Sequence, residues 1–210
     1  MAEKNLDRRQ RRSRRLLRDA LFALILEKGY DAVTVEEITR RADLGRATFY
    51  LHYRDKEDLL LQCLEETADG LAEQIGLLQP ARPQEEDGHL QADFSGKSPV
   101  LLVFQHAAQN ASIYRVILRG EGAYKVSRRI REIASRYAAE FFSARLGYGD
   151  GEPRSTIPIE VVANYFAGSL LGMLTWWLES GMPYSPEQMS ETFRQLLFQG
   201  LRQVIRPEGE

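Results

Sequence analysis

Residues 34–56 constrain the fold of this chain more than any other stretch. Thr34 can cap the start of a helix, and Glu37, three residues later, can return a hydrogen bond to it. Asp43 and Gly45 then break the helical spacing, because both tolerate the backbone angles of a turn. A second short helix can begin directly after Gly45. Two short helices joined in this way predict a helix-turn-helix, which places its second helix in the DNA major groove.

The residues after this turn carry a more specific pattern. The run Thr-Phe-Tyr-Leu-His-Tyr-Arg-Asp-Lys-Glu-Asp-Leu-Leu at 48–60 resembles the TetR family of bacterial one-component repressors. In that family a similar aromatic run is followed by an acidic residue and lysine and then by a leucine-rich fourth helix. The resemblance covers residues 11–71, and beyond them only an all-helical pattern is shared. Asp43 and Gly45 depart from the usual Ala-Gly-Val-Ser turn of the family.

The periodicity of the whole chain predicts an all-α protein of about nine helices. The resemblance implies an N-terminal three-helix domain over residues 11–71, with the helix-turn-helix at about 34–53. A stretch rich in proline, glycine and charge at 79–97 predicts a loop. Residues 98–206 are then expected to form a helical domain that binds an effector and dimerises.

Charge is distributed unevenly along the chain. The formal net charge is −2, but the first 18 residues hold eight basic residues and two acidic ones. We expect residues 1–9 to form a mobile arm and the first helix to run from about Arg11 to Lys28. Arginines crowd the start of that helix, which is unfavourable for cations on macrodipole grounds. We therefore expect some of them to contact DNA phosphates, the alternative being that they only keep the protein soluble.

The second helix of the motif supplies most of the candidate DNA contacts. Phe49 and Tyr53 lie one turn apart and are expected to face the core, which leaves the other face for DNA. Arg46 is the best candidate for reading a guanine, with a phosphate contact as the alternative. The resemblance implies backbone contacts for Tyr50, His52 and Lys56. The full DNA-binding set is Thr34, Arg46, Ala47, Thr48, Tyr50, Leu51, His52 and Lys56.

The segment from Pro158 to Ser180 is apolar on nearly every side, which indicates a helix buried on several sides. In a chain of this size we expect a subunit interface. We predict a homodimer built mainly from this helix and the Gln188 to Arg206 helix. The candidate interface residues are Ala167, Gly168, Leu171, Leu197 and Leu201.

The C-terminal half is also rich in aromatic residues with polar tips. Aromatic residues at helical spacing are usually core, yet the resemblance implies that some line a pocket for a small, mostly apolar ligand. His106, Tyr137 and Trp177 are the expected polar groups of that pocket. The ligand candidates are Phe104, His106, Tyr137, Phe141, Tyr165, Met173 and Trp177. We expect the buried stripe of the Ala123 to Leu146 helix to be Val126, Ile130, Ile133, Ala134, Tyr137, Phe141 and Leu146.

Other classes of function find no support in the sequence. No histidine has neighbours at metal-ligand spacing, and no nucleotide-binding or nucleophile motif is present, so we expect no metal, no cofactor and no enzymatic activity. Cys63, the single cysteine, fits a reducing compartment. No run approaches the length needed to span a bilayer and no signal peptide precedes the first helix, so we expect a cytoplasmic protein with no membrane partner.

These observations favour a homodimeric repressor that a small ligand releases from a palindromic operator. A DNA-associated architectural protein with the same head and no effector is the alternative. An enzyme built on a helical bundle is a weaker one. A cavity of mixed polarity would favour the first, and converging titratable groups the third.

Overall fold

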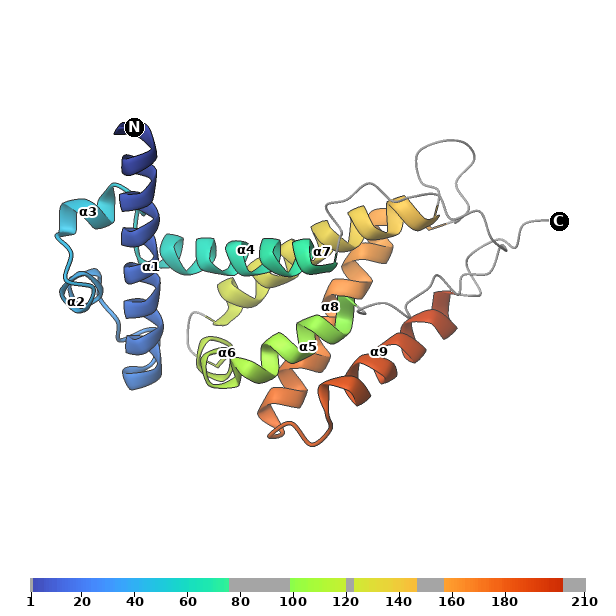
Figure 1. Cartoon of the computed structure of the whole chain (residues 1–210). Helices are drawn as coiled ribbons and strands as arrows, with labels where there is room; N and C mark the ends of the chain where they lie inside the picture. Colours follow the sequence, from blue (N-terminus) through green and yellow to red (C-terminus); the bar gives the residue numbers. More distant parts are fainter. Residues whose placement is uncertain (1, 76–98, 120–122, 147–156, 202–210) are drawn as a thin grey trace. The chain divides into compact units, whose positions relative to one another are not determined.

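The computed structural model describes residues 2–75, 99–119, 123–146 and 157–201, and every regular element in these ranges is an α-helix. The expected all-α fold is confirmed (Figure 1). The helices are α1 (Ala2–Lys28), α2 (Val35–Arg41), α3 (Arg46–Tyr50), α4 (Lys56–Ile75), α5 (Pro99–Gln109), α6 (Ala111–Ile117), α7 (Ala123–Leu146), α8 (Ile159–Glu179) and α9 (Pro186–Leu201). The predicted loop at 79–97 lies outside the described residues.

Helix α1 begins earlier than its sequence predicted. It is helical from Ala2, so the expectation of a mobile arm over residues 1–9 was wrong. The run of arginines therefore lies on α1 itself and not on a separate coil. Gly29, with φ +80°, ends α1 as expected, because glycine accepts the left-handed conformation that stops a helix.

The chain divides into two compact units. One contains Met1–Glu66 and Ser112–Ser127, and the other contains Thr67–Ala111 and Arg128–Glu210. Helices α4, α6 and α7 therefore contribute residues to both units. We call the first unit the head and the second the body.

Helices α1 to α4 build a small core in the head, where α1 packs on α2 and α2 on α3. Leu21 and Ile25 of α1, Ile38 of α2 and Phe49 of α3 all have no exposed surface. The Phe49 ring lies 5.7 Å from that of Tyr53, which is also buried. The prediction that Phe49 and Tyr53 face inward is confirmed. This core fixes which face of α3 is left exposed.

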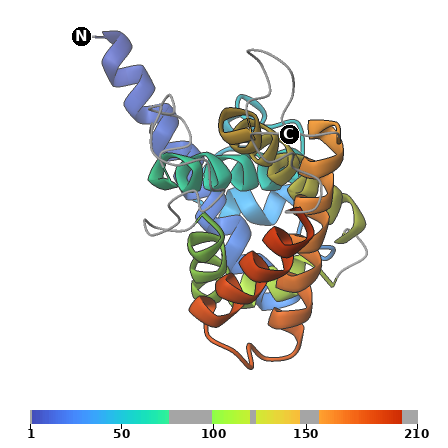
Figure 2. The same ribbon diagram turned by 90° about the vertical axis from the view of Figure 1, so that its right-hand side faces the viewer.

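In the body, α5 packs against α8 and α9 (Figure 2). Phe104 of α5 and Trp177 of α8 meet edge to face with centroids 5.3 Å apart. Phe166 of α8 makes similar contacts with Phe142 of α7, at 5.5 Å, and with Phe193 of α9, at 5.3 Å. Such edge-to-face pairs each add about 0.5–1.5 kcal/mol beyond the burial of their area.

The buried stripe of α7 differs from the predicted one. Val126 and Ile133 are buried as expected, but Ala138 and Phe142 are the next buried residues. Tyr137 and Phe141 were expected there and are only partly covered. A helix with apolar residues on adjacent faces satisfies more than one stripe at helical spacing, so the neighbouring helices decide which one is covered.

Helix α8 is long and apolar enough to cross a membrane by length and composition alone. The expectation that no run approaches this length was therefore wrong. One side of α8 is used inside the body, where Val162, Ala163, Ala167 and Leu170 are buried. A core helix of a globular body passes the same test of length and composition, so this feature does not indicate a membrane segment.

Candidate nucleic-acid interface

The helix-turn-helix begins with the predicted capping box. The Glu37 N–H donates to Thr34 Oγ1 at 3.3 Å, and the Thr34 N–H donates to Glu37 Oε2 at 3.0 Å. Lys28 Nζ of α1 also donates to Glu37 Oε1, at 2.5 Å. This bond, followed by those from Thr34, lowers the pKa of Glu37 to about 2. Thr34, a predicted DNA contact, is exposed, and its hydroxyl is already engaged by Glu37.

The turn of the motif uses the two residues that depart from the family pattern. Asp43 adopts φ 53°, the left-handed region that aspartate tolerates. Gly45 is the N-cap of α3 in extended conformation without a side-chain bond, as expected. The Leu44 N–H donates to the carbonyl of Thr39 at 2.9 Å, which closes the turn against α2.

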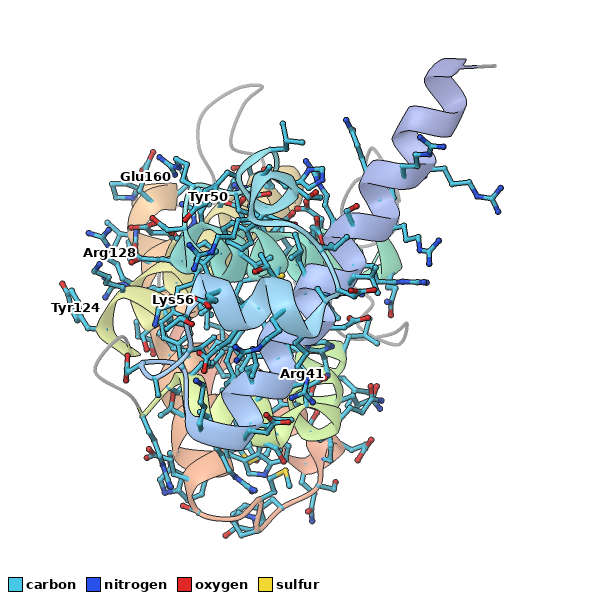
Figure 3. The ribbon with its side chains drawn as sticks, turned by 90° about the vertical axis from the view of Figure 1, so that its left-hand side faces the viewer. Arg41, Tyr50, Lys56, Tyr124, Arg128 and Glu160 are labelled. Carbon is cyan, nitrogen blue, oxygen red and sulfur yellow. The ribbon has the colours of Figure 1, made fainter. Side chains whose placement is uncertain are left out.

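Helix α3 presents four of the predicted contacts on one open face. Arg46, Ala47 and Tyr50 are exposed, and Leu51, the residue that ends the helix, is 81% exposed. Tyr50, labelled in Figure 3, is 58% exposed. Tyr50 and Leu51 are therefore exposed apolar groups beside an arginine on this face.

Arg46 is not free of contacts within the head. Its Nη2 donates to Oε2 of Glu36, on α2, at 2.5 Å, and both side chains are about 60% exposed. Sequence reasoning missed Glu36, because nothing in the spacing of residues 36 and 46 signals that the two helices cross there. The carboxylate places a negative charge on the face expected to meet DNA and holds the guanidinium in one position.

Two further candidates lie at the edge of this face. Thr48 and His52 are half-buried. Burial, followed by the nearby cation of Arg14, lowers the pKa of His52, so its imidazole is neutral at pH 7. A neutral His52 can donate one hydrogen bond to a phosphate but adds no charge.

Lys56 is occupied within the head. Its ammonium donates to the carbonyl oxygens of Tyr30, Asp31 and Val33 at 3.1, 3.0 and 2.8 Å. Because an ammonium has three donors, these bonds use all of them. The residue predicted to contact a phosphate thus directs its donors to the backbone of its own chain.

The N-terminal turns of α1 form an extended basic surface. Residues 8–15 have no buried member, whereas Leu17, two residues later, is wholly buried. Long side chains extend into solvent from these turns (Figure 3). The exposed arginines in this stretch are Arg8, Arg9, Arg11, Arg12, Arg14 and Arg15.

The predicted ligand residues fall in three different places. Phe104 is wholly buried, and Trp177 is 1% exposed with its indole N–H donating to the Tyr184 carbonyl at 2.9 Å, so neither has a free polar tip. Tyr165 is 60% exposed on the outer face of α8. Tyr137 donates to the Asp69 carboxylate of α4, within the body. The remaining candidates, His106, Phe141 and Met173, are half-buried.

The predicted dimer residues are also divided. Ala167 and Leu197 are buried inside the protomer, which removes them from an outer surface. Gly168 is exposed and Leu171 half-buried. Nothing is described of the Leu201 side chain. The exposed side of α8 carries the apolar or small residues Val161, Tyr165, Gly168, Gly172 and Trp176 together with the polar Glu160, Asn164 and Glu179, and Leu196 is exposed on α9.

An all-helical chain with a capped helix-turn-helix and an exposed recognition helix belongs to the helix-turn-helix regulators of transcription. Residues 17–63 match the family described as "Bacterial regulatory proteins, tetR family", and residues 98–199 match the "Transcriptional regulator C-terminal region" of TetR proteins. The chain belongs to the TetR family of DNA-binding transcriptional regulators.

Three relatives extend this comparison. The uncharacterized HTH-type transcriptional regulator YxbF of Bacillus subtilis is 28% identical over 93% of this chain, which spans 47% of the length of that protein. The fatty acid metabolism regulator protein of B. subtilis is 22% identical over 87% of this chain and 92% of its own. The structure of Thermus thermophilus FadR, a TetR-family repressor in complex with lauroyl-CoA, has a TM-score of 0.63 at 18% identity, covering 94% of this chain and 98% of that one.

Proposed function

We propose that this protein is a cytoplasmic, homodimeric repressor that binds a near-palindromic operator and leaves it when a mostly apolar ligand fills the body. The observation that carries the DNA-binding part is the open face of α3, where Arg46, Ala47, Tyr50 and Leu51 are exposed together. An arginine can grip a guanine with two bonds, and apolar groups can contact thymine methyls. The arginines of α1 would add phosphate contacts, which carry no sequence information.

The outer stripe of α8 supports the dimer. Val161, Tyr165 and Trp176 are each about half or more exposed, an uncommon amount of apolar surface on one helix. A Cβ added at Gly168 or Gly172 would meet no atom within 4 Å. Because neither residue has a side chain, the backbone of another helix can approach α8 closely at these positions. The second copy of this chain is the natural occupant, because an isologous contact covers both stripes at once.

The relatives support an acyl compound as the class of ligand. One curated relative is named for fatty acid metabolism, and one structural relative was solved with lauroyl-CoA. The body of this chain is rich in aromatic and aliphatic surface that suits an acyl chain. His106, Phe141 and Met173 remain the candidates that line the site, because half-buried side chains can be both packed and reachable.

Release follows if the ligand binds better to a conformer whose two heads no longer match the half-site spacing. The operator affinity then falls by the coupling free energy, about 1–3 kcal/mol in such systems. By reciprocity, bound operator weakens ligand binding by the same factor.

The experiment that tests this function begins with selection of binding sites from random duplex DNA by the purified protein. We expect an inverted repeat with half-sites about one DNA turn apart. Lauroyl-CoA and stearoyl-CoA are then titrated into the complex, with free coenzyme A as control. Trp176 is half exposed and Trp177 buried, so tryptophan fluorescence reports ligand binding independently.

Two results would favour the other functions. Binding without sequence preference and without response to acyl compounds would support the architectural alternative. If the protein selects an operator but neither acyl-CoA releases it, the acyl class of ligand is rejected and DNA binding stands. The helical-bundle enzyme has weaker support, because the relatives named above are described as regulators.

A further inference from the structure

The lysine that opens α4 has an unusual set of partners. Lys56 Nζ donates to three backbone carbonyls, those of Tyr30, Asp31 and Val33, at 2.8–3.1 Å. It also lies 4.7 Å from the centroid of the Tyr30 ring, within the range of a cation–π contact. A flexible lysine on a DNA-binding surface would keep its donors in water, whereas this one has used all of them.

The three acceptors belong to one short segment between α1 and α2. The Val33 N–H donates to the Tyr30 carbonyl at 3.2 Å, so residues 30–33 form a turn. Thr34 follows directly as the N-cap of α2. The ammonium therefore holds together the turn that sets where α2 starts, and it does so from a position at least 23 residues further along the chain.

The charges around this ammonium are unfavourable for a phosphate. Burial, and then the carboxylates of Glu57, Asp55 and Asp31, raise the pKa of Tyr30, so all three carboxylates lie close to that ring. A phosphate approaching Lys56 would meet the carboxylates of Asp31 and Asp55, and that of Glu57, which is paired with Lys125.

We propose that Lys56 is a positioning residue for DNA binding: it fastens the first turn of α4 to the α1–α2 turn and contacts no phosphate. The proposal rests on DNA binding by the head. Lys56 would act on α3 indirectly, because the turn that it holds sets where α2 starts and α2 packs on α3. Lys56 is the first residue of α4, so the clamp joins the start of this helix to the α1–α2 turn within the head.

The proposal and a phosphate contact predict different outcomes for two substitutions. Lys56→Met keeps the aliphatic stem and removes the donors. Lys56→Arg keeps the charge, but a planar guanidinium cannot direct donors to three carbonyls of one turn as an ammonium does. A positioning role predicts that both variants lose operator binding in the same way. A phosphate contact predicts that Lys56→Arg restores it.

Binding is measured for the full-length protein with selected operator and with random duplex over a range of salt concentrations. We expect both variants to lower the ratio of operator to random affinity about tenfold, the scale of a lost bond to a charged group. The slope of log affinity against log salt should stay at the wild-type value. A slope shallower by about 0.9 per head, or rescue by Lys56→Arg, would overturn the proposal.

Lys125→Met is the control, because it removes a charge from the same unit and no hydrogen bond to the turn; it also releases Glu57, one of the three carboxylates near Tyr30. Lys125 Nζ pairs with Glu57 Oε2 at 3.0 Å and its side chain is 64% exposed. We expect it to leave the operator-to-random ratio near that of the wild type. An equal loss of this ratio in Lys125→Met would overturn the proposal, since it would show a general effect of charge.

Amide hydrogen exchange in the absence of DNA tests the clamp separately from the function. The Val33 amide should exchange faster in both Lys56 variants than in the wild type. Unchanged exchange would overturn the clamp even if the protein binds operator as proposed, and failure of the wild type to bind any DNA would reject the function alone. If Lys56→Met does not fold, Lys56→Arg carries both measurements.

Discussion

Arg46 of α3 and Glu36 of α2 form an ion pair on the open face of the helix-turn-helix, with Nη2 and Oε2 2.5 Å apart. Both side chains are about 60% exposed, so the pair contributes only about 0–1 kcal/mol. DNA can therefore recruit the guanidinium without a large cost.

Substitution of Arg46 separates base reading from phosphate contact. Arg46→Ala should cost about 1–3 kcal/mol at one base pair of the operator and little elsewhere. Glu36→Gln, which frees the arginine and removes a negative charge, should tighten binding to random DNA more than to operator. Affinities for a set of single-base operator variants measure both. An equal loss for Arg46→Ala on every sequence would show that Arg46 contacts phosphate only.

Substitution of Gly168 tests the outer stripe of α8. Gly168→Glu should give monomers that bind operator poorly, because a charge would be buried in the isologous interface. The protomer should keep its helical content, since a Cβ at this position meets no atom within 4 Å. Sedimentation and circular dichroism measure the two properties. Gly168→Ala is the control and should remain a dimer, and a wild type that is monomeric at micromolar concentration would exclude this interface.

The buried thiol of Cys63 predicts how stability depends on alkaline pH. Burial, followed by the charge of Glu66, raises the pKa of Cys63 from its ordinary value to about 12. A group with a raised folded pKa stabilises the protein fully below its unfolded pKa, near 8.5, and less as pH rises towards 12. Above about pH 9, ionisation of Cys63 in the unfolded chain should thus lower the free energy of unfolding by at most about 1.4 kcal/mol per pH unit.

Urea denaturation from pH 7 to pH 11 measures this dependence. The Cys63→Ala variant should lose less stability between pH 7 and pH 11 than the wild type. It should still lose some, because burial raises the pKa of Tyr53 to about 12. A thiol reagent at pH 8 should react with Cys63 only after unfolding. Rapid reaction with the native protein would contradict the burial.

The arginines of α1 should set the salt dependence of DNA binding. Replacing Arg12 and Arg15 by glutamine should make the salt slope shallower by up to about 0.9 for each lost phosphate contact, equally for operator and random DNA. Arg128 and Arg131, exposed on α7, are a matched pair elsewhere in the chain, and their replacement should leave the slope unchanged. Identical slopes for the two double variants would mean that α1 serves solubility alone.

The sequence by itself determined the parts of this protein whose signals are local. The capping box of Thr34 and Glu37, the turn at Asp43 and Gly45, and the end of α1 at Gly29 each depend on residues within one turn of each other. Their geometry follows from backbone preferences and short hydrogen bonds. The recognition helix and its inward residue Phe49 could therefore be predicted.

Tertiary structure alone decided which faces the helices turn inward and which distant charges meet. Helix α8 is apolar on nearly every side, so helical spacing could not say that Ala167 and Trp177 face the core while Tyr165 and Trp176 face outward. A broad polar face normally fixes the rotation of a helix about its axis, and the few polar residues of α8 do not form one. The partners of Lys56 depend on chain segments that come together only after the helices have packed, so no local pattern could reveal them.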